Sequence, residues 1–247
     1  MILPLSRLFS SSRKLGELIV FPSFCKVCST LLEEDGERVV CRSCLGKMAP
    51  ASSPCCVSCG RFFEDGGPAH LCLDCLREMP PFSRHRSCSS YGGKVKDVIL
   101  LYKYRHFRVL GIDLARFAER ALGGDEGLWW GVEAIVPVPL HPRRRRERGF
   151  NQAQVIAVEL ARLKGIDLVD DALVKVKNVP PQTSLQARER VHNIRGAFKI
   201  KKTEEIEGKT VLLLDDVYTT GSTLRECALA LKKSGVKDVR ALTIAQA

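Results

Sequence analysis

The chain has 247 residues, of which 45% are hydrophobic and 27% charged, and its formal net charge at pH 7 is +11. This length and composition allow one ordinary domain plus a smaller one and exclude wholesale disorder. We expect no transmembrane helix, because the sequence has no run of about 18 apolar residues. The excess of positive charge favours a polyanionic partner.

The first 20 residues are weakly apolar and are interrupted by charged residues. A secretory signal peptide ends at a small-residue cleavage site, and this segment lacks a clear one. We therefore predict an N-terminal amphipathic segment over residues 1–20 and a cytoplasmic protein.

The next segment, residues 21–80, carries most of the eleven cysteines. Cys25 and Cys28 form a CxxC pair, and a second CxxC pair follows after twelve residues. The same arrangement begins again at Cys56, an offset of 31 residues. Two arrays with identical spacing indicate an internal repeat, in which one structural unit occurs twice.

Two CxxC pairs can close a tetrahedral shell of four thiolates around Zn²⁺, which leaves no open coordination position. The repeat therefore predicts a double zinc ribbon with two structural zinc ions. The predicted ligands are Cys25, Cys28, Cys41, Cys44, Cys56, Cys59, Cys72 and Cys75. Pairing of ligands between the two arrays remains an alternative. Cys55 could compete with Cys56, although only Cys56 preserves the twelve-residue gap.

Adjacent prolines and several basic residues then predict a linker at residues 81–88 and a second domain at residues 89–247. Residues 89–107 suggest a strand end, a Gly-Gly turn and an amphipathic helix, and a second such helix follows from Leu110. The sequence YKYRHFR at 102–108 interleaves aromatic residues with cations. This pattern suits stacking of nucleobases, although the tyrosines could equally belong to the core.

From residue 134 onward, short apolar strands alternate with helices. The segment 134–140 is a predicted strand, 150–165 a helix that stops at Gly165, and 222–235 a helix before a last strand at 239–246. This alternation predicts an α/β domain with a parallel sheet that is covered on both faces. Ligands bind such sheets at the carboxyl ends of the strands.

A basic segment follows the strand at 134–140. Its guanidinium groups can bind phosphate oxygens in a bidentate way, so pyrophosphate and a nucleic-acid backbone are both candidate ligands, against the alternative of a solvated charge run. These candidates are Arg143, Arg144, Arg145, Arg146 and Arg148. Asn151 is placed to cap the helix that follows.

The segment 178–196 has two prolines that break any helix. Gln182 and Arg188 are predicted substrate contacts there, and Thr183, Arg190 and Asn193 are further candidates. Surface positions are the alternative for all five.

The sequence VLLLDDVYTTGSTL at 211–224 combines a buried strand with a polar turn. Asp215 and Asp216 are expected to emerge at the carboxyl end of the strand. The turn from Thr219 to Thr223 leads into a helix whose N–H groups and dipole favour an anion. Its hydroxyls lie around Gly221, where no side chain blocks close approach. Carboxylates suit the hydroxyls of a ribose or a Mg²⁺ ion, so the segment predicts a ribose 5-phosphate site.

Residues 211–224 resemble the phosphoribosyl-pyrophosphate (PRPP) motif of the type I phosphoribosyltransferases along their full length. The resemblance implies that Asp215 and Asp216 act at the catalytic position and hold the ribose hydroxyls. It also implies a 5-phosphate site made by Thr219, Thr220, Gly221, Ser222 and Thr223. The arginine segment stands where that fold has its pyrophosphate loop, and residues 178–196 lie near its substrate hood.

The segments VPVPLHPRRRRERGFNQA and NVPPQTSLQARERVHNIRGAF, together with the cysteine-rich front, resemble the ComF family of competence-related proteins. In that family a zinc-finger segment precedes a phosphoribosyltransferase-like domain, and members are linked to natural transformation and single-stranded DNA. The resemblance implies Mg²⁺ with PRPP or a nucleotide phosphate as ligand. It further implies single-stranded DNA and proteins of the competence machinery as partners.

Three functions are therefore compared. The first is a PRPP-binding protein of DNA uptake. The second is an active transferase of nucleotide metabolism, similar to amidophosphoribosyltransferases, in which Mg²⁺ and the arginines stabilise the leaving pyrophosphate. The third is a non-catalytic assembly protein that acts through its zinc ribbons.

Overall fold

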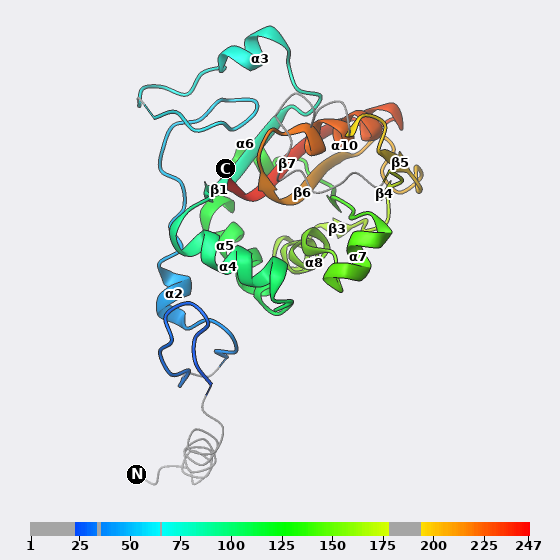
Figure 1. Cartoon of the computed structure of the whole chain (residues 1–247). Coiled ribbons are helices and arrows are strands. Elements are labelled where there is room, and N and C mark those ends of the chain that lie inside the picture. The colour runs from blue at the N-terminus through cyan, green and yellow to red at the C-terminus, as the bar shows by residue number, and fades with distance from the viewer. Residues whose placement is uncertain (1–22, 34–35, 65, 178–193) are drawn as a thin grey trace, which may run out of the picture. The chain divides into compact units, whose positions relative to one another are not determined.

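The computed structural model describes residues 23–33, 36–64, 66–177 and 194–247, and the predicted segment 1–20 lies outside these ranges. The chain divides into two compact units, Met1–Met48 and Ala49–Ala247 (Figure 1). The boundary falls between the two cysteine arrays, so each unit contains one of them.

The first unit is a small cysteine-centred knuckle. Phe24 and Leu31 form an antiparallel bridge, and helix α2 spans Arg42–Gly46. The buried interior consists of cysteines with Leu32, Val39 and Val40. A segment with so few apolar residues cannot build a large core, so the cysteines at its centre must supply much of its stability.

The second unit opens with a copy of the same motif. Cys55 and Phe62 form the equivalent bridge, and helix α3 spans Leu73–Arg77. These positions keep the 31-residue offset from the first unit, so the repeat in the sequence is also a repeat in structure. The four zinc-ligand cysteines of this copy are buried in one apolar cluster with residues of strands β6 and β7.

The body of the second unit is a five-stranded parallel sheet of order β1-β7-β6-β2-β3. The strands are β1 Arg84–Ser90, β2 Ala134–Pro137, β3 Asp167–Leu168, β6 Thr210–Tyr218 and β7 Asp238–Gln246. β6 lies at the centre, and Val211 to Leu214 are fully buried. This burial explains the unbroken apolar run of that strand, because helices cover both faces of a parallel sheet.

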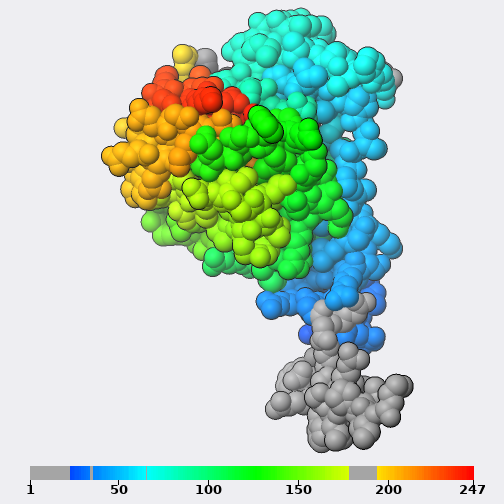
Figure 2. Space-filling model, turned by 180° about the vertical axis from the view of Figure 1, so that it is seen from behind, coloured from blue at the N-terminus to red at the C-terminus, as the bar shows by residue number. Residues whose placement is uncertain are grey.

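Helices α5 and α8 pack together on one face of the sheet, and α10 packs on the other (Figure 1). The helices are α4 Gly93–Tyr104, α5 Leu110–Leu122, α6 Glu126–Trp129, α7 Pro142–Arg148, α8 Gln152–Lys164 and α10 Ser222–Lys233. The space-filling view shows the cyan second ribbon against the rest of its unit (Figure 2).

The strand order reverses between β2 and β6. From β2 the chain passes through α8 to β3 on one side, whereas from β6 it passes through α10 to β7 on the other. A crevice forms at such a switch point, outside the carboxyl ends of the two strands. The arginine segment follows β2 and the polar turn follows β6, so the topology brings these two candidate segments to one edge.

Two predicted strands are present but do not join this sheet. β4 Leu173–Lys175 and β5 Phe198–Ile200 form a separate antiparallel pair. The residues between them, 178–193, lie outside the described ranges. The structure therefore does not place the predicted contacts Gln182 and Arg188, or the further candidates Thr183, Arg190 and Asn193.

The predicted linker at 81–88 is wrong, because residues 84–88 belong to strand β1. The prolines and charges that suggested a linker stand at the entry to an edge strand, where a proline causes least disruption. The compact unit accordingly begins at Ala49 rather than at residue 89. Within the described residues, no helix combines the length and apolar character needed to cross a membrane.

Candidate functional site

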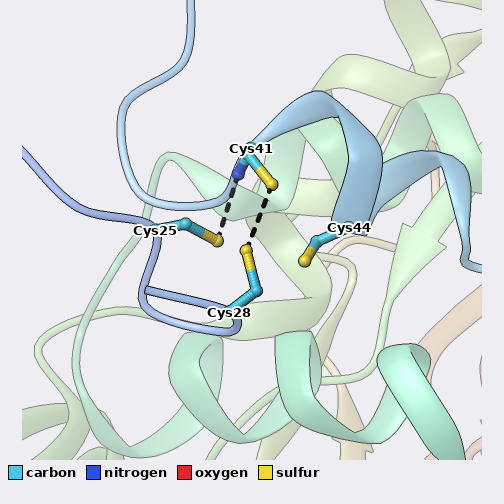
Figure 3. Close-up of side chains that lie close together, drawn as sticks. All are labelled: Cys25, Cys28, Cys41 and Cys44. Carbon is cyan, nitrogen blue, oxygen red and sulfur yellow. Dashed lines mark hydrogen bonds between the residues drawn. The ribbon is translucent and has the colours of Figure 1, made fainter. Parts of the chain in front are cut away.

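Each cysteine array gathers into a cluster of its own. The four sulfur atoms of the first cluster, from Cys25, Cys28, Cys41 and Cys44, lie within 4.8 Å of one another (Figure 3), and the same holds for Cys56, Cys59, Cys72 and Cys75. None of the eight is in a disulfide. The Cys28–Cys41 and Cys59–Cys72 sulfur pairs are both 3.6 Å apart. Zinc–sulfur bonds in a tetrahedron place sulfurs about 3.7 Å apart, so both clusters fit structural Zn²⁺.

Backbone donors repeat with the sulfurs. The N–H of Cys41 donates to the Cys25 sulfur at 3.3 Å, and the N–H of Cys72 donates to the Cys56 sulfur at 3.4 Å. Such bonds favour thiolates over thiols. The ligands pair within each array, Cys55 is not part of the second cluster, and no ligand is exchanged between the arrays.

The two aspartates at the end of β6 point to opposite faces of the sheet, because side chains alternate along a strand. Asp216 forms an ion pair with Lys103 of helix α4, with 2.7 Å between Oδ1 and Nζ. Asp215 lies on the other face, within electrostatic range of Lys175 and Cys227. The sequence predicted both aspartates but neither lysine.

Burial and the neighbouring Asp216 charge raise the pKa of Asp215 to about 7, although the N–H of Asp216 donates to Asp215 Oδ1 at 2.8 Å. This carboxyl group is therefore placed where little solvent compensates its charge. A ligand that donates hydrogen bonds to it would favour the ionised form.

The raised pKa of Asp215 predicts how stability changes with pH. In the unfolded chain an aspartate titrates near 3.9. Between about pH 4 and about pH 7 the folded state holds more protons, so its free energy of unfolding should fall as pH rises and level off above. Asp215→Asn should lose this fall. Chemical unfolding of both proteins across that range measures the difference, with the exposed Asp170→Asn as control, and parallel curves would contradict the assignment.

Lys103 is a functional candidate that periodicity alone could not identify. It is mostly buried, at 15% exposed, and neutralises the carboxylate of Asp216. Its neighbour Tyr102 is fully buried and donates its O–H to the Gln152 carbonyl at 2.8 Å. Tyr102 therefore belongs to the core and does not stack on nucleobases, whereas Tyr104 is exposed.

Lys103→Met is expected to lower the free energy of unfolding by about 3 kcal/mol, because it leaves a buried carboxylate without its partner. Lys94→Met provides the matched control on the same helix, since Lys94 pairs with Asp97 at the surface. That control should change stability by less than about 0.5 kcal/mol. Urea unfolding measures both, and equal effects would show that the Lys103–Asp216 pair is not special.

The polar turn after β6 has the geometry of an anion site. Gly221 adopts a left-handed conformation with φ of 73°, and α10 begins at the next residue. A side chain at Gly221 would collide with the ring of Tyr218, so both conformation and space require glycine. The hydroxyls of Thr220 and Ser222 lie 2.9 Å apart. The first N–H groups of a helix have no partners within it, and here they begin at this turn.

A cavity of about 340 Å³ adjoins the turn. Thr220, Ser222 and Arg225 line one side, and Glu78 and Met79 from the end of the second ribbon line another. The hydroxyl-bearing part of the turn is therefore open to a ligand. Thr219 is exposed and Thr223 is half-buried.

The arginine segment is not a loop, as its comparison with a pyrophosphate loop suggested, but the seven-residue helix α7. The helix divides the guanidinium groups. Arg144 and Arg148 are half-buried, whereas Arg143, Arg145 and Arg146 are exposed. Arg143 pairs with Glu147 at 3.1 Å. Residues four apart share a helix face, which explains why Arg144 and Arg148 behave alike.

Lys175 connects this helix face to the aspartates. Burial lowers the pKa of Lys175, and the charges of Arg144 and Arg148 add to this effect, while the charges of Cys227 and Asp215 oppose it. Cations from α7 and β4 thus face the Asp215 side of the sheet edge. The sequence gave no direct sign of Lys175.

Asn151 does not cap α8 with its side chain, contrary to the prediction. Its Nδ2 instead donates to the Val138 carbonyl at 3.1 Å. The chain returns past the end of β2 at this point, and the buried amide fixes that approach. Asn151 therefore holds both ends of the segment that contains α7.

Comparisons with known proteins agree with this architecture. A model of the double zinc ribbon domain matches residues 18–76, and a model of the phosphoribosyl transferase domain matches residues 147–247. Competence protein F of Haemophilus influenzae is 38% identical over 116 residues, which cover 47% of this chain and 51% of the relative. DNA utilization protein YhgH of Escherichia coli K12 is 34% identical over 108 residues, which cover 44% and 47%.

Competence protein ComFC of Streptococcus pneumoniae is 30% identical over 160 residues, which cover 65% of this chain and 67% of the relative. The matches to the first two relatives span about half of their length. Among solved structures, the allosteric regulatory enzyme of purine biosynthesis matches with a TM-score of 0.38 and 19% identity, covering 55% of this chain and 25% of that one.

The fold and the two clusters define the class of protein: a cysteine-rich double zinc ribbon joined to an α/β domain of the type I phosphoribosyltransferase kind. Within that class, the chain belongs to the ComF family of competence and DNA utilization proteins. The fold class and the family that the sequence predicted are confirmed.

Proposed function

We propose that the protein binds PRPP, or a related ribose 5-phosphate ligand, together with Mg²⁺ and serves DNA uptake by also binding single-stranded DNA. One observation carries the proposal. Asp215 and Asp216 end the central strand one short turn before the left-handed Gly221, at the edge where the arginine helix also lies. Acceptors for hydroxyls thus stand between two groups of donors for phosphates.

The ribose would lie against the two aspartates. Their carboxylates can accept hydrogen bonds from vicinal hydroxyls, and bonds to a charged acceptor are stronger than neutral ones. Lys103 holds Asp216 in place from α4. The carboxylates repel phosphate, so they also favour a single orientation, with the sugar over the strand end and its phosphate over the turn.

The 5-phosphate would lie at the turn from Thr219 to Thr223. The N-terminus of α10 favours an anion through its N–H groups and dipole. The hydroxyls of Thr220 and Ser222 face the adjoining cavity and supply further donors. The twelve-residue helix provides a stable base for this turn.

The pyrophosphate would extend toward Arg144 and Arg148. Their guanidinium groups are half-buried, where charge interactions are less screened than at the surface. Mg²⁺ bound with PRPP supplies charge neutralisation for the pyrophosphate oxygens. Lys175 adds positive charge on the same side.

Single-stranded DNA would use a different surface. Arg143, Arg145 and Arg146 are exposed on α7, and the chain carries a net charge of +11. Deoxyribose lacks the 2-hydroxyl, so the aspartate pair offers DNA little to bind. The relatives named for competence and DNA utilization support a role in DNA handling.

Calorimetric titration of the zinc-loaded protein with PRPP, with and without Mg²⁺, tests the proposal. We expect saturable binding that requires Mg²⁺. Absence of binding by the folded, zinc-loaded protein would reject the phosphoribosyl site and leave single-stranded DNA as the leading ligand. Release of pyrophosphate during the titration would instead favour an active transferase.

A further inference from the structure

We propose that the second zinc ribbon is a structural part of the phosphoribosyl site and positions the phosphate turn through His85 and Tyr218. The inference rests on the proposed function for its ligand, but its structural part can be tested without one. It assigns different tasks to two ribbons that the sequence makes look equivalent.

The second ribbon is bonded to strand β1 at its first knuckle. The N–H of His85 donates to the Ser58 carbonyl at 2.7 Å, and Nδ1 of His85 donates to the Cys59 carbonyl at 2.7 Å. Arg86 donates to the carbonyls of Cys56 and Val57 at 3.2 and 3.3 Å. Two zinc-ligand residues thus have their backbone carbonyls fixed by side chains of the sheet.

Gly60 shows how closely the knuckle approaches the strand. A side chain at this position would collide with the carbonyl oxygen of His85. The equivalent residue in the first ribbon is Ser29, which has nearly the same backbone conformation, with φ of 61° against 68° for Gly60. The conformation alone therefore tolerates a side chain, and the contact with β1 is what requires glycine in the second ribbon.

His85 transmits this contact to the end of β6. The side chain is 0% exposed, and its ring stacks on Tyr218 with 4.3 Å between centroids and 20° between planes. Its Nε2 lies 3.0 Å from the Thr243 hydroxyl on the neighbouring strand β7. With both ring nitrogens bonded, the ring has one orientation and offers Tyr218 a fixed surface.

Tyr218 in turn supports the phosphate turn. Its ring packs so closely under Gly221 that no β-carbon fits there. A continuous series of contacts therefore runs from the Cys59 knuckle through His85 and Tyr218 to the residue that starts α10. Packed interiors transmit small displacements because they contain few voids.

A second contact joins the ribbon to the same turn from the side. Glu78, just beyond α3, accepts from Arg225 through its backbone carbonyl at 3.2 Å and pairs with it through Oε1 at 3.5 Å. Arg225 belongs to the first turn of α10, and both residues line the cavity beside Thr220 and Ser222. The ribbon thus forms one wall of the space next to the predicted phosphate position.

Gly60→Ser tests the inference because it keeps all eight cysteines and introduces the residue that the first ribbon already carries. Ser29→Ala is the matched control in the other compact unit. Metal analysis should find two zinc ions in each variant. Hydrogen exchange without ligand should be about tenfold faster at residues 218–223 in Gly60→Ser and unchanged in Ser29→Ala. Unchanged exchange in a zinc-loaded Gly60→Ser would overturn the proposal.

Ligand binding provides the second readout. Gly60→Ser should bind PRPP with Mg²⁺ about tenfold more weakly than the wild type, as is usual when a supporting residue is disturbed. Should Gly60→Ser fold poorly, Tyr218→Leu removes the stacked ring from the other end and should give the same two effects. Failure of the wild type itself to bind PRPP would reject the proposed function, whereas the exchange result would still decide the role of the ribbon.

Discussion

Replacing Asp215 and Asp216 together with asparagine is expected to weaken PRPP binding by at least about 100-fold. The two carboxylates are the acceptors at the strand end, and an amide presents both donors and acceptors where only acceptors fit two hydroxyls. Asp216 would also lose its ion pair with Lys103. Calorimetric titration with PRPP and Mg²⁺ measures the effect, and thermal unfolding verifies that the variant is folded.

The control uses a second pair of consecutive aspartates in the same unit. Asp170 and Asp171 pair with residues at the surface, Gln154 and two lysines. Changing both to asparagine removes the same charge and should leave PRPP affinity unchanged. Single-stranded DNA affinity should hardly change in either variant. Equal loss of PRPP and DNA binding in the Asp215 and Asp216 variant would contradict separate sites.

The arginine helix is expected to separate the two ligands. Arg144→Gln with Arg148→Gln should weaken PRPP binding by about 100-fold, because each removes a charged, half-buried donor. Arg143→Gln with Arg145→Gln removes the same charge from the exposed part of the helix. This second variant should retain PRPP affinity within about twofold.

Single-stranded DNA should give the opposite result. Each lost phosphate contact lowers the slope of log affinity against log salt by about 0.7 for single strands. Arg143→Gln with Arg145→Gln should therefore lower this slope measurably, as followed by fluorescence anisotropy at several salt concentrations. An unchanged slope would exclude the exposed face of α7 from the DNA surface, and a larger loss of PRPP affinity than in the Arg144 and Arg148 variant would reverse the assignment.

Local features of the fold were predictable because local chemistry determines them. The cysteine spacing fixed both clusters, since two CxxC knuckles twelve residues apart can meet only in one way around a metal. Gly165 ends α8 in the left-handed conformation with φ of 64°, as a glycine after a periodic segment indicates. The apolar run before Asp215 predicted the central strand.

Contacts between distant segments were not predictable from one sequence. Lys103 meets Asp216, and His85 meets Tyr218, only because the strand order places β1 and α4 beside β6 and β7. The linker prediction was wrong for the same reason. Prolines and charges mark irregular chain locally, but pairing with β7 makes residues 84–88 a strand.

The division of the arginines also depended on structure. Five arginines within six residues predicted a phosphate-binding segment, but only the helical twist of α7 shows that Arg144 and Arg148 share a face. The repeat hid a further difference. Ser29 and Gly60 occupy equivalent positions, and only the contact of the second ribbon with β1 explains why one is a glycine.

The most direct measurement compares the affinities of ribose 5-phosphate and 2-deoxyribose 5-phosphate by calorimetry. Both sugars carry the phosphate for the turn at Thr219–Thr223, and they differ only in the hydroxyl that the aspartates would accept. We predict that the wild type binds ribose 5-phosphate at least about tenfold more tightly, since a lost hydrogen bond to a charged group costs about 1.5–3 kcal/mol. The preference should vanish in the Asp215→Asn, Asp216→Asn variant. Equal affinity of the wild type for the two sugars would contradict a ribose site at the end of β6.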